Sequence, residues 1–167
     1  MTRLLSLPAL VVAGALFLAA CGGSSSSSSS TAASSPAPAK ASSSPRPAPV
    51  VGTSSSALGT FLVDAKGRAL YLWDADHGAM SACSGACAQA WPPLTTASAP
   101  KASGAAKASL LGTIKRADGT REVTYAGHPL YYFAGDSAAK QTNGQGSDSF
   151  GSPWWVVSPA GQAIQKG

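Results

Sequence analysis

The sequence predicts an all-β, mostly antiparallel domain built from two related hairpin or meander repeats. The first observation is a motif, Leu-Tyr-x-aromatic-x-x-Asp, which ends at Asp76 and occurs again, sixty residues later, ending at Asp136. The second is that each copy follows a glycine, Gly67 or Gly127, in a stretch with turn chemistry. The third is that short segments rich in β-branched and aromatic residues alternate with such turns.

The similarity between the copies extends beyond the motif. With an offset of sixty, residues 57–76 align without gaps on residues 117–136, and Trp73 corresponds to Phe133. The identical pairs are Ala57/Ala117, Gly59/Gly119, Thr60/Thr120, Val63/Val123, Gly67/Gly127, Leu70/Leu130, Tyr71/Tyr131 and Asp76/Asp136. Such self-similarity predicts a duplicated structural unit. The expected domain, residues 57–167, divides into repeat one (about 57–94), a linker (about 95–109) and repeat two (about 110–165).

Repeat one is expected to contain a hairpin. Residues 60–63 and 68–73 are β-prone, and residues 64–67 between them have the composition of a turn. Because side chains alternate across a strand, Tyr71 and Trp73 should share one face and the two leucines beside them the other.

Repeat two is expected to be a three-strand meander over 110–115, 120–125 and 130–133, with turns at 117–119 and 127–129. Its motif aromatics, Tyr131 and Phe133, should again share a face. The remaining expected elements are a helical turn at 87–91, a strand at 154–158, a turn at 159–162 and a short closing strand at 163–165.

Each motif aspartate lies three residues past the second aromatic, where its strand should end. There Asp76 and Asp136 could accept backbone N–H bonds and fix the exit turn, or accept a bond from a tyrosine hydroxyl of the other copy. Two interpretations stay open. In one, the aromatics are core residues and the aspartates lock turns. In the other, the two copies form one aromatic groove with carboxylates at its rim.

The N-terminus has the features of a secretory signal over residues 1–20, with Arg3 before a mainly apolar run that is short for a membrane span. The sequence Leu18-Ala19-Ala20-Cys21 resembles the lipobox of bacterial lipoproteins, which implies cleavage before Cys21 and a lipid anchor, including palmitate, on that residue. Residues 21–56 are then expected to be a disordered Ser/Ala/Pro tether, since they have almost no large apolar side chains.

These features together resemble the bacterial lipoproteins described as a secreted repeat of unknown function. The resemblance rests on the two motif copies, on Cys83-x-Gly85-x-Cys87-Ala88-x-x-Trp91-Pro92-Pro93-Leu94, and on the late Trp154-Trp155-Val156-Val157. It implies an exported, lipid-anchored location in the cell envelope, outward-facing or periplasmic, and a repeat architecture. It implies no activity and no catalytic residue.

Cys83 and Cys87 are expected to form a disulfide, since lipidation of Cys21 would leave them as a pair in an oxidising compartment. Gly85 between them would let the chain leave helical geometry and close the bridge. Two alternatives remain: thiol–disulfide exchange, or a copper site with His77 and Met80. Covalent haem is disfavoured, because Ala88 stands where a ligand histidine should follow the second cysteine.

The formal net charge is +5, and the cations are scattered with no basic stripe among aromatics, so a nucleic-acid partner is not indicated. No catalytic pattern stands out, and His128 is interpreted as a turn residue. The expected function is a lipid-anchored, non-catalytic binding or structural module without a cofactor, with an envelope protein or wall polymer as partner. The alternative is an envelope redox or copper-handling protein that uses the Cys-x₃-Cys segment. An enzyme acting on wall polymer has little support.

Overall fold

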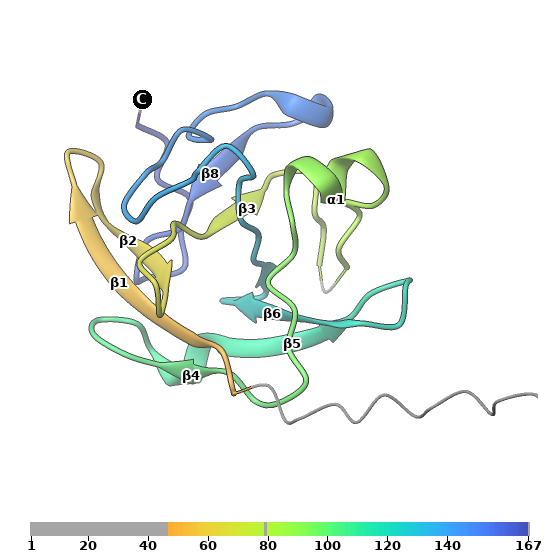
Figure 1. Ribbon diagram of the computed structural model, residues 1–167, viewed down its shortest axis with the longest axis horizontal. Coiled ribbons are helices and arrows are strands. Elements are labelled where there is room, and N and C mark those ends of the chain that lie inside the picture. Colours follow the sequence, from red (N-terminus) through yellow and green to blue (C-terminus); the bar gives the residue numbers. More distant parts are fainter. Residues whose placement is uncertain (1–46, 79, 167) are drawn as a thin grey trace, which may run out of the picture. The chain divides into compact units, whose positions relative to one another are not determined.

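The computed structural model describes residues 47–78 and 80–166, and these confirm a mostly antiparallel β fold with one short helix (Figure 1). The elements are β1 (Val50–Ser56), β2 (Gly59–Asp64), β3 (Tyr71–Trp73), α1 (Ala86–Ala90), β4 (Lys101–Ala102), the 3-10 turn η1 (Ala108–Leu110), β5 (Leu111–Lys115), β6 (Arg121–Tyr125), β7 (His128–Pro129), the 3-10 turn η2 (Ser149–Gly151) and β8 (Trp154–Val156). The predicted signal segment, the lipidation site Cys21 and the tether up to residue 46 lie outside the described residues.

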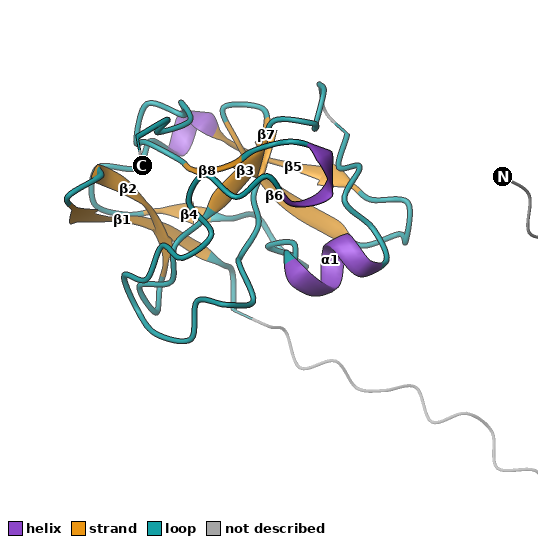
Figure 2. Ribbon diagram, turned by 90° about the horizontal axis from the view of Figure 1, so that it is seen from above, coloured by secondary structure: helices purple, strands orange, loops and turns teal. Residues whose placement is uncertain are grey.

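The strands form three small sheets, ordered β2-β1-β4, β3-β8 and β5-β6-β7 (Figure 2). Every strand pair is antiparallel except β1 with β4, which is parallel. Single bridges extend the pairing to residues outside these strands: Val63 pairs with Ala69, Tyr71 with Tyr131, and Thr95 with Glu122. Backbone pairing is thus nearly continuous through the domain, although the regular strands are short.

The expectation that the tether extends to Ser56 is wrong for its last residues, because Val50–Ser56 forms β1. This strand pairs along its length with β2, and Val51 is buried among the leucines of the core. Two adjacent valines followed by small β-compatible residues are enough to form a strand once a partner is available. Repeat one therefore begins at β1, the counterpart of β5.

The two repeats share a three-strand plan. The gapless alignment is nevertheless wrong by one residue in the strand that precedes the turn into each motif. In repeat one Leu70 N–H bonds to Leu62 C=O, and in repeat two Leu130 N–H bonds to Val123 C=O. The turn before the motif is one residue shorter in repeat two than in repeat one. It has only Ala126 and Gly127 between paired residues, both at positive φ (50° and 86°). Leu62 rather than Val63 is thus the counterpart of Val123.

The predicted alternation of side chains is confirmed, and both faces are buried. Tyr71, Trp73 and Tyr131 belong to a mostly aromatic cluster, which we call the aromatic core. Leu70, Leu72 and their neighbours belong to a second cluster, the aliphatic core. The central strands therefore have no solvent-facing side, which explains why the motif has large apolar residues on both faces of the strand.

The helical turn and the disulfide were both predicted. Cys83 and Cys87 are bonded, with their Cα atoms 5.3 Å apart, and α1 begins at Ala86. Gly85 precedes the helix at φ 56° and ψ −124°, a conformation open to glycine but costly for other residues. Pro92 and Pro93 follow the helix and prevent its continuation.

Several predicted strands are shorter than expected. Regular pairing covers only Tyr71–Trp73 of 68–73. The expected turn at 127–129 and strand at 130–133 are wrong in position, because β7 is His128–Pro129 and, of residues 130–133, only Tyr131 forms bridges. The expected linker contains β4 and η1. The C-terminal turn and closing segment are present, since Val157 bridges Ala163. The short strands leave room for the loops that carry the motif aspartates.

Candidate functional site

The two motif tyrosines meet at the centre of the domain. Tyr71 N–H donates to Tyr131 C=O (2.8 Å), and Tyr131 N–H donates to Tyr71 C=O (2.9 Å). Equivalent residues of the two repeats therefore pair with each other. This is the arrangement expected around a pseudo-twofold axis that relates the repeats.

Each tyrosine hydroxyl then donates to the aspartate of the other repeat. Tyr71 Oη lies 2.6 Å from Asp136 Oδ2, and Tyr131 Oη lies 2.6 Å from Asp76 Oδ2. We call Asp76 with Tyr131 the first half-site and Asp136 with Tyr71 the second half-site. The sequence allowed this cross-repeat bond as one role for the aspartates, and the structure contains it twice.

The turn-locking role is also present. In each repeat the aspartate N–H closes a turn by donating to the backbone carbonyl of the second motif aromatic, Trp73 or Phe133, at 3.1 Å. The second carboxylate oxygen accepts a backbone N–H from the following loop: Ala82 N–H at 2.8 Å for Asp76, and Asn143 N–H at 2.9 Å for Asp136. Each carboxylate thus holds its own loop with one oxygen and the other repeat with the second.

A column of aromatic rings, stacked at two contacts and tilted at the third, packs against the motif tyrosines. Its order is Phe133, Trp91, Trp154 and Trp73, with ring centroids 4.5, 4.0 and 5.0 Å apart. Tyr71 meets Trp91 edge-on at 5.3 Å, and Tyr131 meets Trp154 edge-on at 5.2 Å. Trp91 and Trp154 are therefore equivalent residues, a relation that the sequence analysis missed. The sequence signal is the shared spacing, since each tryptophan is followed three residues later by an aliphatic residue, Leu94 or Val157. In the structure each of these pairs with the leucine before a motif tyrosine.

Burial excludes an open groove at the motif residues. Both tyrosines are fully buried, and Asp76 and Asp136 are 8% and 3% exposed. Burial, and then the bond to a carboxylate, raise the pKa of Tyr71; burial and nearby acids raise that of Tyr131. Burial also raises the pKa of Asp76, and the bonds from Tyr131 and Ala82 only partly offset it. The motif side chains are bonded to one another and are inaccessible to a large ligand.

A buried charged network backs the first half-site. Ser81 Oγ lies 2.7 Å from Tyr131 Oη and also accepts a bond from Arg116, whose guanidinium pairs with Glu122 at 2.7 Å. Arg116 also donates to the carbonyl oxygen of Cys83 (2.5 Å). Glu122 is fully buried, and burial raises its pKa to about 7 against the opposing effect of Arg116. Arg116 is one of the scattered cations of the sequence, and no sequence pattern singled out Glu122.

The second half-site has no such network among the described residues and relies on close packing. Gly144 follows Asn143 as Cys83 follows Ala82, and its N–H lies 3.4 Å from Tyr71 Oη. A Cβ at Gly144 would lie 2.6 Å from the Trp91 ring and 3.0 Å from the Phe133 ring. Glycine is therefore required here by the approach of the loop to two aromatic rings.

The candidate copper ligands differ in exposure to solvent. Cys83 and Cys87 are buried (1% and 6% exposed) and bonded to each other, whereas Met80 is 70% exposed and His77 is exposed. Within the described ranges, no three His, Cys, Asp or Glu side chains are grouped closely enough to hold a metal. In the oxidised protein, both thiols are occupied by the disulfide.

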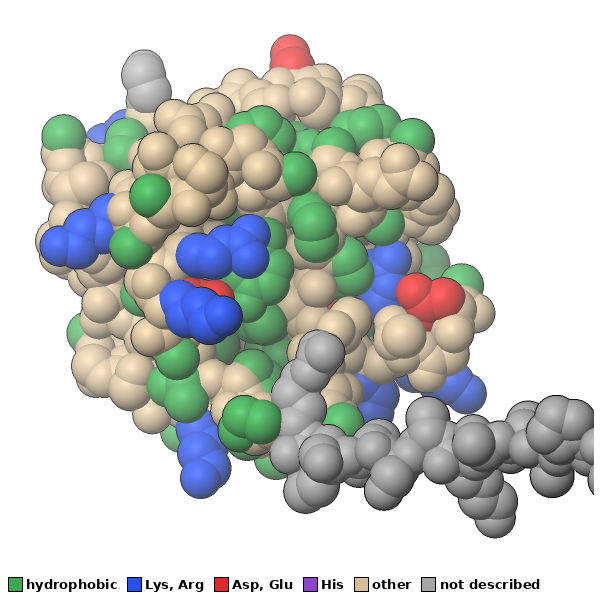
Figure 3. All heavy atoms as spheres, in the orientation of Figure 1, with side chains coloured by type: hydrophobic (Ala, Val, Ile, Leu, Met, Phe, Trp, Pro, Cys, Tyr) green, Lys and Arg blue, Asp and Glu red, His purple; other side chains and the backbone are tan. Residues whose placement is uncertain are grey.

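The surface contains no single basic region on the face shown in Figure 3, where Lys and Arg side chains lie in small separate groups. Arg68 stacks over the Tyr132 ring at 4.1 Å, and the Tyr132 hydroxyl donates to Asp64 Oδ2 (3.2 Å). No helix in residues 47–78 and 80–166 has the length and apolar character needed to cross a bilayer.

Comparison with known proteins gives a family. Residues 52–95 and residues 112–158 each match the sequence model of a lipoprotein family described as a secreted repeat of unknown function. The two matches begin near the start of β1 and β5. They end one residue after Leu94 and Val157, each of which bonds to the motif leucine of the other repeat. No curated protein and no solved structure matches the chain.

Proposed function

The chain belongs to the family of secreted repeats of unknown function, and from that premise we propose that it is a lipid-anchored, non-catalytic module of a bacterial cell envelope. Cys21 carries the lipid, the residues between Cys21 and β1 are the tether, and the folded domain binds or positions another envelope component. The single observation that carries the non-catalytic role is the burial of both motif copies.

The chemical argument is direct. A nucleophile or general base must reach its substrate and hold a suitable protonation state. Tyr71 and Tyr131 are fully buried, and their raised pKa values keep them protonated at neutral pH. Both oxygens of each motif carboxylate already accept a bond. The motif therefore serves to join two repeats and not to transform a substrate.

A redox or copper-handling role is second. Its support is the Cys83–Cys87 pair close in sequence to Met80. Against it, exchange needs a sulfur that a thiolate can attack, and both cysteines are at most 6% exposed. Counting reactive thiols in the native protein, then titrating copper after mild reduction, tests this role. Slow reduction and no copper uptake would remove it.

The anchor is tested by metabolic labelling with a clickable palmitate in a bacterial host. We expect label and membrane association for the full chain and for the Cys83→Ser/Cys87→Ser control, and loss of both for Cys21→Ser. Label that persists in Cys21→Ser would contradict the assignment.

The non-catalytic role is tested by complementation of a deletion strain. Asp76→Asn and Asp136→Asn should complement in proportion to the amount of folded protein, which is measured by limited proteolysis in cell extracts. A variant that stays folded and abundant yet fails to complement would indicate chemistry at the half-sites and overturn the proposal.

A further inference from the structure

The equivalent strands β1 and β5 differ at their outer edges. The outer edge of β1 is covered by β4 and its neighbours, since Lys101 N–H donates to Pro49 C=O (2.9 Å) and Ser103 N–H to Val51 C=O (2.9 Å). Among the described residues, β5 pairs with β6 alone. In residues 47–78 and 80–166, β5 therefore has no counterpart of the strand that covers this edge of β1.

The unpaired backbone groups on β5 can be identified. Ladder bonds to the β6 hairpin run from Arg116 N–H to Thr120 C=O and from Ala126 N–H to Leu110 C=O, so the even-numbered residues of β5 face β6. Backbone groups alternate sides along a strand. The N–H and C=O groups of Thr113 and Lys115 therefore face outward, and within the described ranges neither residue makes a backbone bond on that side.

The equivalent glycines show the same difference. A Cβ built at Gly52 would lie 2.7 Å from Ser103 Oγ, which belongs to the covering segment. A Cβ built at Gly112 meets only Thr124 of the partner strand β6 within 4 Å. All of β5 is partly or fully exposed, which leaves it accessible to an added strand.

Positive charge accumulates beside this edge. Lys115 and Arg121 are directly opposite each other on β5 and β6, and both are exposed. Facing like charges destabilise a sheet, and both ion pairs among the described residues involve Arg116 instead. Both acids of the hairpin are already engaged, Glu122 by Arg116 and Asp118 by Arg116 and Thr120. An anionic partner would relieve this repulsion.

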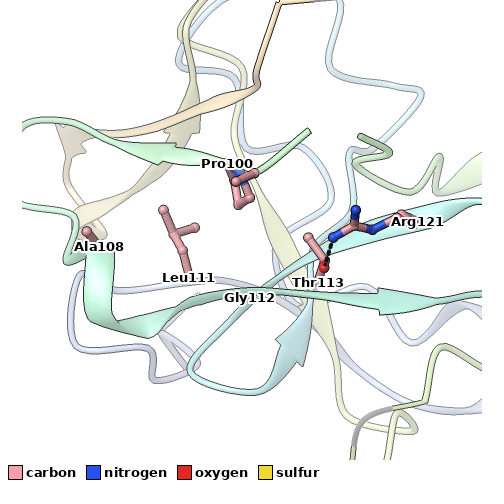
Figure 4. Close-up of a pocket in the computed structure, with 7 residues that line it drawn as sticks. Pro100, Ala108, Leu111, Gly112, Thr113 and Arg121 are labelled. Carbon is pink, nitrogen blue, oxygen red and sulfur yellow. Dashed lines mark hydrogen bonds between the residues drawn. The ribbon is translucent and has the colours of Figure 1, made fainter. Parts of the chain in front are cut away.

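A hollow of about 220 Å³ adjoins the same strand (Figure 4). Pro100 and Leu111 make one end apolar, and at the other end Arg121 donates to Thr113 Oγ1 (2.7 Å). Peptides that add to a sheet edge use main-chain bonds for affinity and such side-chain pockets for specificity. The hollow has the size of one side chain of an added strand.

We propose that the free edge of β5 binds an extended, carboxylate-bearing peptide segment of another envelope protein by β-strand addition. The segment bonds to the outward groups of Thr113 and Lys115, and its carboxylates face Lys115 and Arg121. A second copy of this chain fits less well, because pairing β5 with β5 would bring two such cationic groups together. This inference rests on the proposed non-catalytic role and names its partner class.

The test uses the full chain in mild detergent and an eight-residue peptide that alternates Glu with Val and Thr; the comparison peptide has Lys in place of Glu. We expect binding of the acidic peptide alone, with slowed hydrogen exchange at the amides of Thr113 and Lys115. Thr113→Pro removes one outward N–H donor, together with the hydroxyl that accepts a bond from Arg121, and leaves the backbone bonds between β5 and β6 in place. It should weaken binding about tenfold while the fold is kept.

Lys115→Glu should weaken binding by about tenfold or more, whereas Lys66→Glu, an equal charge change on the β2–β3 turn, should change it less than about twofold. No binding, equal binding of both peptides, or binding without protection at Thr113 and Lys115 would each overturn the proposal, and so would self-association through β5. Because lipid on Cys21 is not needed for the assay, these results are independent of whether the anchor assignment fails.

Discussion

The first and second half-sites have the same bonding geometry and different surroundings. In both, a tyrosine hydroxyl lies 2.6 Å from the aspartate of the other repeat. The first is backed by Ser81 and the buried Arg116–Glu122 pair, and its loop is tied by the disulfide. The second is backed by Gly144 and the rings that it touches.

This difference shows that the repeated motif specifies the pairing, while each loop supplies its own means of holding it. A buried ion pair and a bridged loop make the first half-site dependent on protonation and on oxidation. Packing of a glycine on aromatic rings has neither dependence, so the second half-site should respond mainly to steric changes.

The largest expected effect comes from removing one charge of the ion pair. Arg116→Met leaves Glu122 buried without its cation, and we expect the free energy of unfolding to fall by about 3–5 kcal/mol. Urea denaturation measures this. Arg121→Met on the same hairpin is the control and should stay within about 0.5 kcal/mol. A loss below about 1 kcal/mol for Arg116→Met would contradict the role of this pair.

The next effect is the pH dependence of stability. The pKa of Glu122 is raised to about 7 and that of Asp76 is also raised, so the folded protein holds protons that the unfolded chain releases. Stability should therefore fall as pH rises from about 4.5 to about 7, by up to roughly 3 kcal/mol. Urea midpoints from pH 5 to 8 measure the slope, which Glu122→Gln should reduce. Stability that rises across this range would refute the assignment.

Removal of the tyrosine hydroxyls should give smaller losses. Tyr71→Phe and Tyr131→Phe each take a donor from a buried carboxylate, at about 1.5–3 kcal/mol. Tyr131→Phe should cost more, because its oxygen also bonds Ser81. A double-mutant cycle with Asp76→Asn should show coupling for Tyr131 and near-additivity for Tyr71. Equal coupling for both tyrosines would contradict the cross-repeat pairing.

The smallest effect is expected for the disulfide. It closes a five-residue loop, so Cys83→Ala/Cys87→Ala should lower stability by at most about 2 kcal/mol. Its specific result is local: hydrogen exchange at Ala82 N–H should accelerate more than exchange at Asn143 N–H. Ser84→Ala, within the same loop, is the control and should change neither. Equal acceleration at both amides would mean that the bridge does not act on one half-site alone.

The sequence predicted the features that follow from local pattern. Strand alternation placed Tyr71 and Trp73 apart from the leucines, and glycine at residue 85 anticipated the exit from helical geometry at the disulfide. The repeat itself made the cross-repeat bond between tyrosine and aspartate an available role, because equivalent residues can exchange contacts.

The charged network had no such signal. Arg116 pairs with Glu122 and also bonds to Ser81 and to the Cys83 carbonyl, which belong to the loop of the other repeat. No periodicity in a single repeat encodes that contact. The equivalence of Trp154 and Trp91 was not recognised in the sequence, because the offset between the repeats changes from sixty to sixty-three after the motif aspartates.

The exchange of hydroxyl–carboxylate bonds makes the domain indivisible. Either repeat by itself would expose its motif tyrosine and aspartate without the partners that the other repeat provides. It would also expose the surface that the other repeat covers. A chain with a single repeat should therefore exist as a symmetric pair of subunits, each completing the other. Fusing the two through residues 96–109 replaced an encounter that depends on concentration with one that is built into the polypeptide.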